Sequence, residues 1–255
     1  MRRTTVRRTA LAASTLSLAL LVSACGSDGS SAKDEPKGKA SSGAPATGGQ
    51  KALSQGELDK LALTEADLKD HKVTKPTAAD VASSKTVTTD KPACKPLNDV
   101  MSLRTVGAPA ASVTRKVIAV PKGPAAGASA EEKAKAGLAA LGTTMTSDTL
   151  ASYDGTGAAD ALATLKKAGT DCAGGFSVIA EGDKSAITKV APAAYTGGDE
   201  AAAYTLTADL DGTPSTFHLV AIRKGATLAT FYAWSLAGKA EQPKAVIDAQ
   251  MKKLG

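Results

Sequence analysis

The chain has 255 residues, of which 43% are hydrophobic but only 3% aromatic, and its formal charge at neutral pH is +6. Four of its 31 basic residues lie within the first eight positions, so the rest keeps 27 basic against 25 acidic residues, a net charge of +2. Because the remaining lysines are interspersed with acids rather than clustered, the composition argues against a nucleic-acid partner.

Residues 1–24 follow the plan of a secretory signal peptide. An arginine-rich start precedes an apolar segment, Ala10 to Val22, that is shorter than the ~20 residues needed to span a bilayer. The order Leu21-Val22-Ser23-Ala24-Cys25-Gly26 is similar to the lipobox of bacterial lipoproteins, whose cysteine thiol receives diacylglycerol before cleavage. The sequence therefore predicts that Cys25 is lipidated and holds the chain on the outer face of the cell membrane. It leaves open whether export follows the general secretory or the twin-arginine route.

Residues 25–50 are rich in Gly, Ser, Ala, Lys and Pro and contain no large apolar residue. Such a segment buries too little surface to offset its ordering entropy, which predicts a disordered tether with a reach of about 25–30 Å. Residues 51–255 then fit one domain of ordinary size.

The first half of this domain begins with helix signals. Ser54 and Glu57 have capping-box spacing, and Thr64 can cap a second short turn. The stretch from Val73 to Pro92 is polar and interrupted by prolines. We then expect a short helix near 97–103, a strand over 112–120, and a surface excursion over 121–141 with one helix capped by Ser129.

The second half is predicted to be mainly strands. A strand over 143–153 precedes a helix with Leu162, Leu165 and Ala168 on one side, and a last helix begins near Pro243. Between these helices we expect five strands, at 175–181, 185–191, 201–210, 215–223 and 227–236. Adjacent strands bracketed by helices predict an α+β fold with a mainly antiparallel sheet and flanking helices.

The last two strands are predicted to form a central hairpin. With Lys224-Gly225 as a two-residue turn, Phe217 would lie opposite Tyr232 and His218 opposite Phe231. Both faces of this hairpin are largely apolar, so we expect cover on both sides, with the last helix on one of them. One face would carry Phe217, Leu219, Ala221, Leu228, Tyr232 and Trp234.

Two cysteines remain once Cys25 is lipidated. An even pair in an exported domain indicates a disulfide, so we expect Cys94 and Cys172 to be joined and to staple the single mature domain. Their spacing does not match a redox-active Cys-x-x-Cys motif.

Candidate chemistry in the chain is sparse. Only His71 and His218 could supply imidazole, and neither has an acidic cluster at metal-ligand spacing, so we expect no metal and no other cofactor. A Gly-x-Ser-x-Gly elbow is absent, and we expect no catalytic residue. The tentative ligand-binding residues are Arg104, Arg115, His218 and Arg223, since the arginines could receive an anionic group.

The order of several motifs resembles a known family. The motifs are Leu63-Thr64-Glu65-Ala66-Asp67-Leu68, Pro92-Ala93-Cys94 before a short helix, the strand and helix from Thr143 to Cys172, Arg223-Lys224-Gly225, and the closing helix around Val246–Met251. This layout resembles the actinobacterial lipoproteins and sensor kinases that carry the PknH-type extracellular sensor domain. The resemblance implies an α+β fold around an antiparallel sheet and a binding or sensing role. That family usually has two disulfides, whereas only the Cys94–Cys172 pair is possible here.

The leading functional hypothesis is a non-enzymatic, sensor-like module that binds a small molecule, an envelope component or a partner protein. An alternative is a carrier of lipid or another apolar molecule, which requires an apolar cavity of at least ~300 Å³. A further alternative is an envelope hydrolase, which requires His218 in an open cleft beside a Ser or a carboxylate.

Overall fold

The structure of the chain is a computed structural model that describes residues 50–121, 123–210 and 212–255. The predicted signal peptide, Cys25 and nearly all of the predicted tether lie outside these residues. Among the helices in the described ranges, none is long and apolar enough to cross a membrane.

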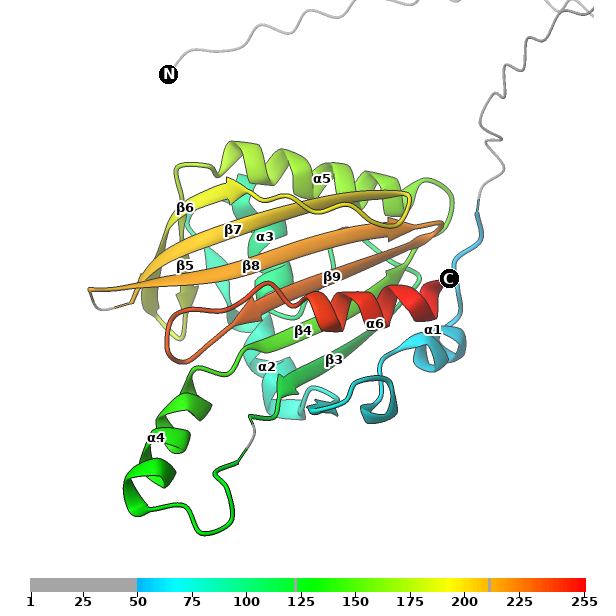
Figure 1. Ribbon diagram of the computed structural model, residues 1–255. Coiled ribbons are helices and arrows are strands. Elements are labelled where there is room, and N and C mark those ends of the chain that lie inside the picture. Colours follow the sequence, from blue (N-terminus) through cyan, green and yellow to red (C-terminus); the bar gives the residue numbers. More distant parts are fainter. Residues whose placement is uncertain (1–49, 122, 211) are drawn as a thin grey trace, which may run out of the picture. The chain divides into compact units, whose positions relative to one another are not determined.

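Most helices and strands of the described chain lie close to the predicted segments, whereas the strands over 71–74 and 88–89 and the helix over 78–86 are not predicted (Figure 1). The helices are α1 (Gln55–Leu61), α2 (Ala78–Thr86), α3 (Lys95–Met101), α4 (Ala130–Leu141), α5 (Gly157–Asp171) and α6 (Lys244–Leu254). The strands are β1 (His71–Thr74), β2 (Thr88–Thr89), β3 (Ala111–Ala119), β4 (Met145–Ser152), β5 (Phe176–Ala180), β6 (Asp183–Pro192), β7 (Glu200–Leu210), β8 (Thr213–Lys224) and β9 (Thr227–Trp234).

These strands form one nine-stranded sheet in the order β1-β3-β4-β9-β8-β7-β6-β5-β2. Every pair of neighbours is antiparallel, which confirms the predicted α+β fold with a mainly antiparallel sheet and flanking helices. The hairpin of β8 and β9 lies near the middle of the sheet, as predicted from its two apolar faces.

Capping residues explain where several helices begin. Ser54 and Ser129 each close a capping box, with Glu57 and Glu132, at the starts of α1 and α4 as predicted. The stretch from Val73 to Pro92, for which the sequence indicates only a polar segment interrupted by prolines, contains α2 and β2. The N-cap of α2 is Thr77, whose side chain and backbone exchange hydrogen bonds with Asp80.

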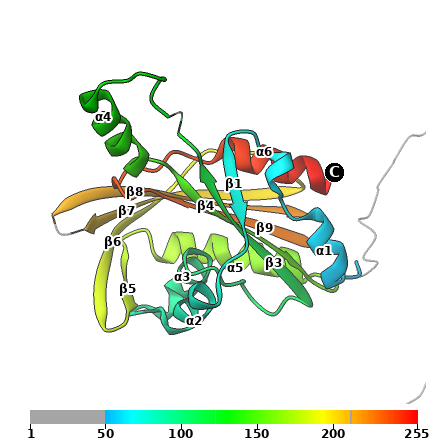
Figure 2. The ribbon, with the colours of Figure 1, turned by 90° about the horizontal axis from the view of Figure 1, so that it is seen from below.

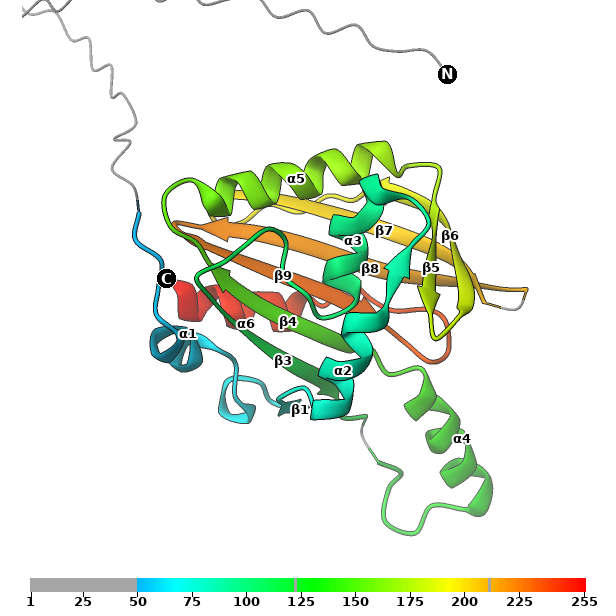
Figure 3. The ribbon, with the colours of Figure 1, turned by 180° about the vertical axis from the view of Figure 1, so that it is seen from behind.

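Helices cover both faces of the sheet. Figure 2 shows α6 on one side of the strands and α2, α3 and α5 on the other, and Figure 3 shows the latter three in front of the sheet. Buried side chains divide accordingly into two clusters. The first includes Leu162 and Leu165 of α5 with Leu219 of β8, and the second includes Ile247 of α6 with Phe231 of β9.

The predicted register of the last hairpin is wrong, although its two faces are right. Lys224 pairs with Thr227, so Gly225 and Ala226 form the turn, with Gly225 at φ +56°. Moving the turn by one residue shifts every pairing by two, so Leu219 rather than Phe217 lies opposite Tyr232. Because side chains alternate with period two, a shift of two leaves each residue on its predicted face.

The predicted disulfide between Cys94 and Cys172 is present. Both residues are fully buried, and the bond joins the start of α3 to the end of α5 across a sequence separation of 78. It therefore fixes together two helices on the same face of the sheet.

Candidate functional site

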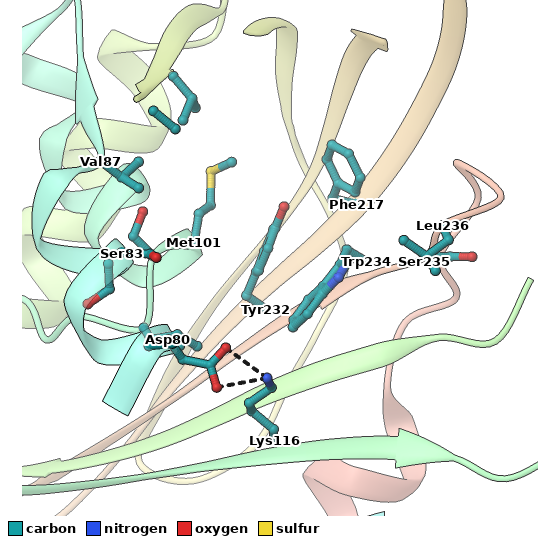
Figure 4. Close-up of a pocket in the computed structure, with 16 residues that line it drawn as sticks. Asp80, Ser83, Val87, Met101, Lys116, Phe217, Tyr232, Trp234, Ser235 and Leu236 are labelled. Atoms are coloured by element: carbon teal, nitrogen blue, oxygen red, sulfur yellow. Dashed lines mark hydrogen bonds and ion pairs between the residues drawn. The ribbon is translucent and has the colours of Figure 1, made fainter. Parts of the chain in front are cut away.

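A cavity of about 620 Å³ opens between the sheet and the helices α2 and α3 (Figure 4). This volume lies within the range that binds small organic ligands in proteins. Its walls come from α2, from the end of α3, and from β3, β5, β8 and β9. The apolar side chains that line it include Val87, Met101, Val178, Phe217, Tyr232, Trp234 and Leu236.

Three aromatic rings form the sheet side of this cavity. Phe217 lies on β8, and Tyr232 and Trp234 follow at alternate positions of β9, so all three project from one face. The rings of Tyr232 and Trp234 are stacked with centroids 5.5 Å apart, and the ring of Phe217 lies tilted at 6.0 Å from Tyr232. Burial raises the pKa of the Tyr232 phenol, which stays uncharged at neutral pH. The rings therefore offer an uncharged surface on which an apolar or flat ligand can stack.

The opposite wall is α2, which has no buried residue of its own. Polar contacts attach it at both ends. At its carboxyl end, the Arg104 guanidinium donates to the carbonyls of Ser84 and Val87 and pairs with Asp99 at 2.9 Å. At its start, Asp80 accepts hydrogen bonds at 2.9 and 3.0 Å from the Lys116 ammonium on β3.

The four tentative ligand-binding residues do not come together, and none of them lines this cavity in the described chain. Arg104 lies outside the cavity lining, where its hydrogen bonds hold the carboxyl end of α2 against α3. Arg115 is buried on the other face of the sheet, where it donates to the Leu63 carbonyl at 3.3 Å. Arg223 forms ion pairs with Asp199 and Glu200 at the far end of β8.

His218 alternates along β8 with Phe217 and Leu219, so it faces the α6 side, away from the cavity. Its Nε2 lies 3.2 Å from the Ala240 carbonyl. Burial lowers the pKa of this imidazole, and the Ala240 hydrogen bond opposes the shift only in part. His218 therefore occupies a half-buried, hydrogen-bonded position rather than the open cleft that the hydrolase hypothesis requires.

Metal-binding side chains do not cluster in the described ranges, where no group of three His, Cys, Asp or Glu residues could hold an ion. Among the residues that the structure describes, the charged side chains that line the large cavity are Asp80 and Lys116. Its remaining polar side chains are the hydroxyls of Ser83, Ser84, Ser102, Ser235 and Tyr232. The arrangement can thus hold an apolar molecule and contact a polar end at its rim.

Comparisons with known proteins give few relatives. No protein-family model matches the chain, and no curated protein matches its sequence. One solved structure that it matches is the crystal structure of the extracellular domain of PknH from Mycobacterium tuberculosis. The two share 10% sequence identity at a TM-score of 0.46, with 80% of this chain and 96% of that chain covered.

Proposed function

We propose that this chain is an extracytoplasmic lipoprotein, anchored through a lipid on Cys25. Its folded domain is a non-enzymatic, sensor-like module that binds an apolar or amphipathic small molecule. The binding site is the cavity between α2, α3 and the sheet, and the observation that carries the proposal is its lining by Phe217, Tyr232 and Trp234. The lipobox-like order before Cys25 supports the location of the protein.

Energetic reasoning supports ligand binding at this place. Leu236 is exposed and Trp234 partly exposed at this cavity, whereas Phe217 and Tyr232 keep only 8% and 9% of their surface accessible. Apolar surface in a concave site lacks favourable burial wherever water contacts it. A ligand that covers them recovers roughly 25 cal/mol for each Å² of apolar area removed from water. The rigid sheet supplies one side of the site before binding, which limits the ordering entropy that the ligand must offset.

The test uses Trp234, because it is the only tryptophan in the chain and lines the cavity. The neutral, apolar dye N-phenyl-1-naphthylamine should quench the Trp234 emission and saturate at one molecule per chain. Ala79→Phe, on the cavity side of α2, should fill part of the site and weaken binding at least about tenfold. Ala82→Phe, at another exposed alanine of α2 that lies outside the cavity lining, is the matched control. Binding that does not saturate, or that both variants reduce equally, would contradict the proposal.

A carrier of lipid or another apolar molecule is the second candidate, and the same apolar lining favours it. A carrier must release its ligand to a second membrane. Transfer of the dye from loaded protein to phospholipid vesicles, at a rate that rises with vesicle concentration, would therefore favour a carrier over a sensor.

A further inference from the structure

The two charged residues of the cavity lie together at one side of it. Asp80 comes from α2 and Lys116 from β3, and Figure 4 shows their contact beside the rings of Tyr232 and Trp234. About a quarter of each side chain is exposed, 26% for Asp80 and 27% for Lys116. A ligand packed on the rings would therefore reach this pair with one end.

The Asp80 carboxylate is already occupied by the protein. Its Oδ2 accepts from the Thr77 backbone N–H at 2.7 Å, from the Thr77 hydroxyl at 2.9 Å and from Lys116 at 3.0 Å, and its Oδ1 accepts from Lys116 at 2.9 Å. The Thr77 backbone hydrogen bond, followed by those from Lys116 and the Thr77 hydroxyl, lowers the pKa of Asp80 to about 2. Asp80 is thus the N3 residue of the capping box that begins α2, with little capacity left for a cationic ligand.

Lys116 retains unused hydrogen-bonding capacity. An ammonium group has three N–H donors, and within the described chain both hydrogen bonds of Lys116 go to the single carboxylate of Asp80. A second anionic oxygen can approach the remaining N–H without displacing Asp80. The Ser83 hydroxyl, one turn further along α2, can donate to the same anion, whereas the Ser84 hydroxyl already donates to the Val81 carbonyl at 2.9 Å.

We propose that the ligand is an amphipathic anion, with an apolar body on the rings of Phe217, Tyr232 and Trp234 and a carboxylate or phosphate headgroup on Lys116. This inference rests on the proposed binding function of the cavity and adds the charge of the ligand. Lys116 is then the residue that determines headgroup specificity, and Asp80 orients its ammonium group.

The test compares three probes with the same dodecyl chain and different headgroups: dodecanoate, dodecanol and dodecylammonium, each below its aggregation concentration. Trp234 fluorescence reports binding to the mature chain, residues 25–255, carrying Cys25→Ser so that no detergent is needed. Dodecanoate should bind about three- to tenfold more tightly than dodecanol, as expected for one charge-assisted hydrogen bond at a partly exposed site. Dodecylammonium should bind most weakly.

Lys116→Met keeps the apolar stem of the side chain and removes its charge. Because Lys116 also holds α2 through Asp80, this variant should weaken dodecanol somewhat and dodecanoate more, so that the preference for the anion is lost. Lys72→Met, an exposed lysine of β1 away from the cavity, should change nothing. Lys116→Arg should keep the preference for the anion that Lys116→Met loses.

Three results would overturn the headgroup inference while leaving the cavity as a binding site: equal affinity for all three probes, tightest binding of dodecylammonium, or an equal loss for all three in Lys116→Met. Absence of saturable binding for every probe, together with failure of N-phenyl-1-naphthylamine to bind, would overturn the proposed function as well.

Discussion

Asp148 on β4 is a carboxyl group in the interior of the domain, opposite Arg115 of the neighbouring strand. Its Oδ1 is buried and has no hydrogen-bond partner in the described chain. Burial raises the pKa of Asp148 to about 8, and the charge of Arg115 offsets only part of the shift. The folded protein therefore keeps a proton that the unfolded chain releases near pH 4.

This difference in pKa between the folded and unfolded protein determines how the free energy of unfolding changes with pH. Because the folded pKa lies above the unfolded one, the contribution of Asp148 to stability is greatest below pH 4 and declines as the pH rises towards 8. Asp148→Asn should remove that decline and raise the free energy of unfolding at pH 8 by at least about 1 kcal/mol. Urea unfolding at pH 5 and pH 8 measures the free energy of unfolding of both proteins. Glu131→Gln, at an exposed residue of α4, is the control. If the variant follows the wild-type pH dependence, Asp148 is ionised in the folded state.

Gly169 on α5 owes its identity to a close contact. A Cβ atom at this position would overlap the ring of Tyr204 on β7. Gly169→Ala should therefore separate α5 from the sheet and lower the free energy of unfolding by about 1–3 kcal/mol. Gly137→Ala in α4, where nothing lies within 4 Å, should instead raise it by about 0.5–1 kcal/mol through helix propensity. Thermal unfolding of the two variants checks this prediction, which fails if both shift in the same direction.

At the scale of elements, α2 is the least secured wall of the candidate site. It contributes no buried residue, so its position depends on Arg104 at one end and on the Asp80–Lys116 pair at the other. Arg104→Ala should speed amide hydrogen exchange throughout Ala78–Thr86 and weaken dye binding. Arg104→Lys should restore neither, because an ammonium cannot reproduce the planar set of donors.

The matched control is Arg223→Ala, which removes ion pairs with Asp199 and Glu200 far from α2. It should leave both exchange in α2 and dye affinity unchanged. Equal acceleration in the two variants would mean that Arg104 stabilises the whole domain rather than this helix.

The same elements show how far the sequence predicts the structure. Capping boxes and hydrophobic periodicity locate α1, α4, α5, α6 and the long strands, because these signals are local. They also place Phe217, Tyr232 and Trp234 on one face, since alternation survives the error in the turn. The helix α2 has no apolar stripe, and only the Thr77–Asp80 spacing signals it.

The cavity itself is beyond such local signals. Its width depends on where Arg104 and Lys116, distant from α2 in sequence, hold that helix above the rings. Arg104 was a reasonable candidate for an anion site, but its donors are directed to Ser84, Val87 and Asp99. The sequence therefore predicts that the three rings share a face and marks Arg104 as a candidate. It does not predict the cavity between the rings and α2.

At the scale of the whole molecule, the proposed anchor predicts a defined amino terminus. Mass spectrometry of protein extracted from membranes of the producing cell should find a chain that begins at Cys25 and carries diacylglycerol on it. Cys25→Ser should lose the lipid mass, while its far-ultraviolet circular dichroism stays that of the wild type. A chain that begins elsewhere, or an unmodified Cys25, would contradict the proposed lipoprotein.

The most direct measurement of the central claim is native mass spectrometry of the protein purified from its own envelope. A non-covalent adduct at one per chain should accompany the wild type and Ala82→Phe and be lost from Ala79→Phe, whose new side chain occupies the cavity. An adduct retained by Ala79→Phe, or none in repeated preparations of the wild type, would contradict a ligand site between α2 and the sheet.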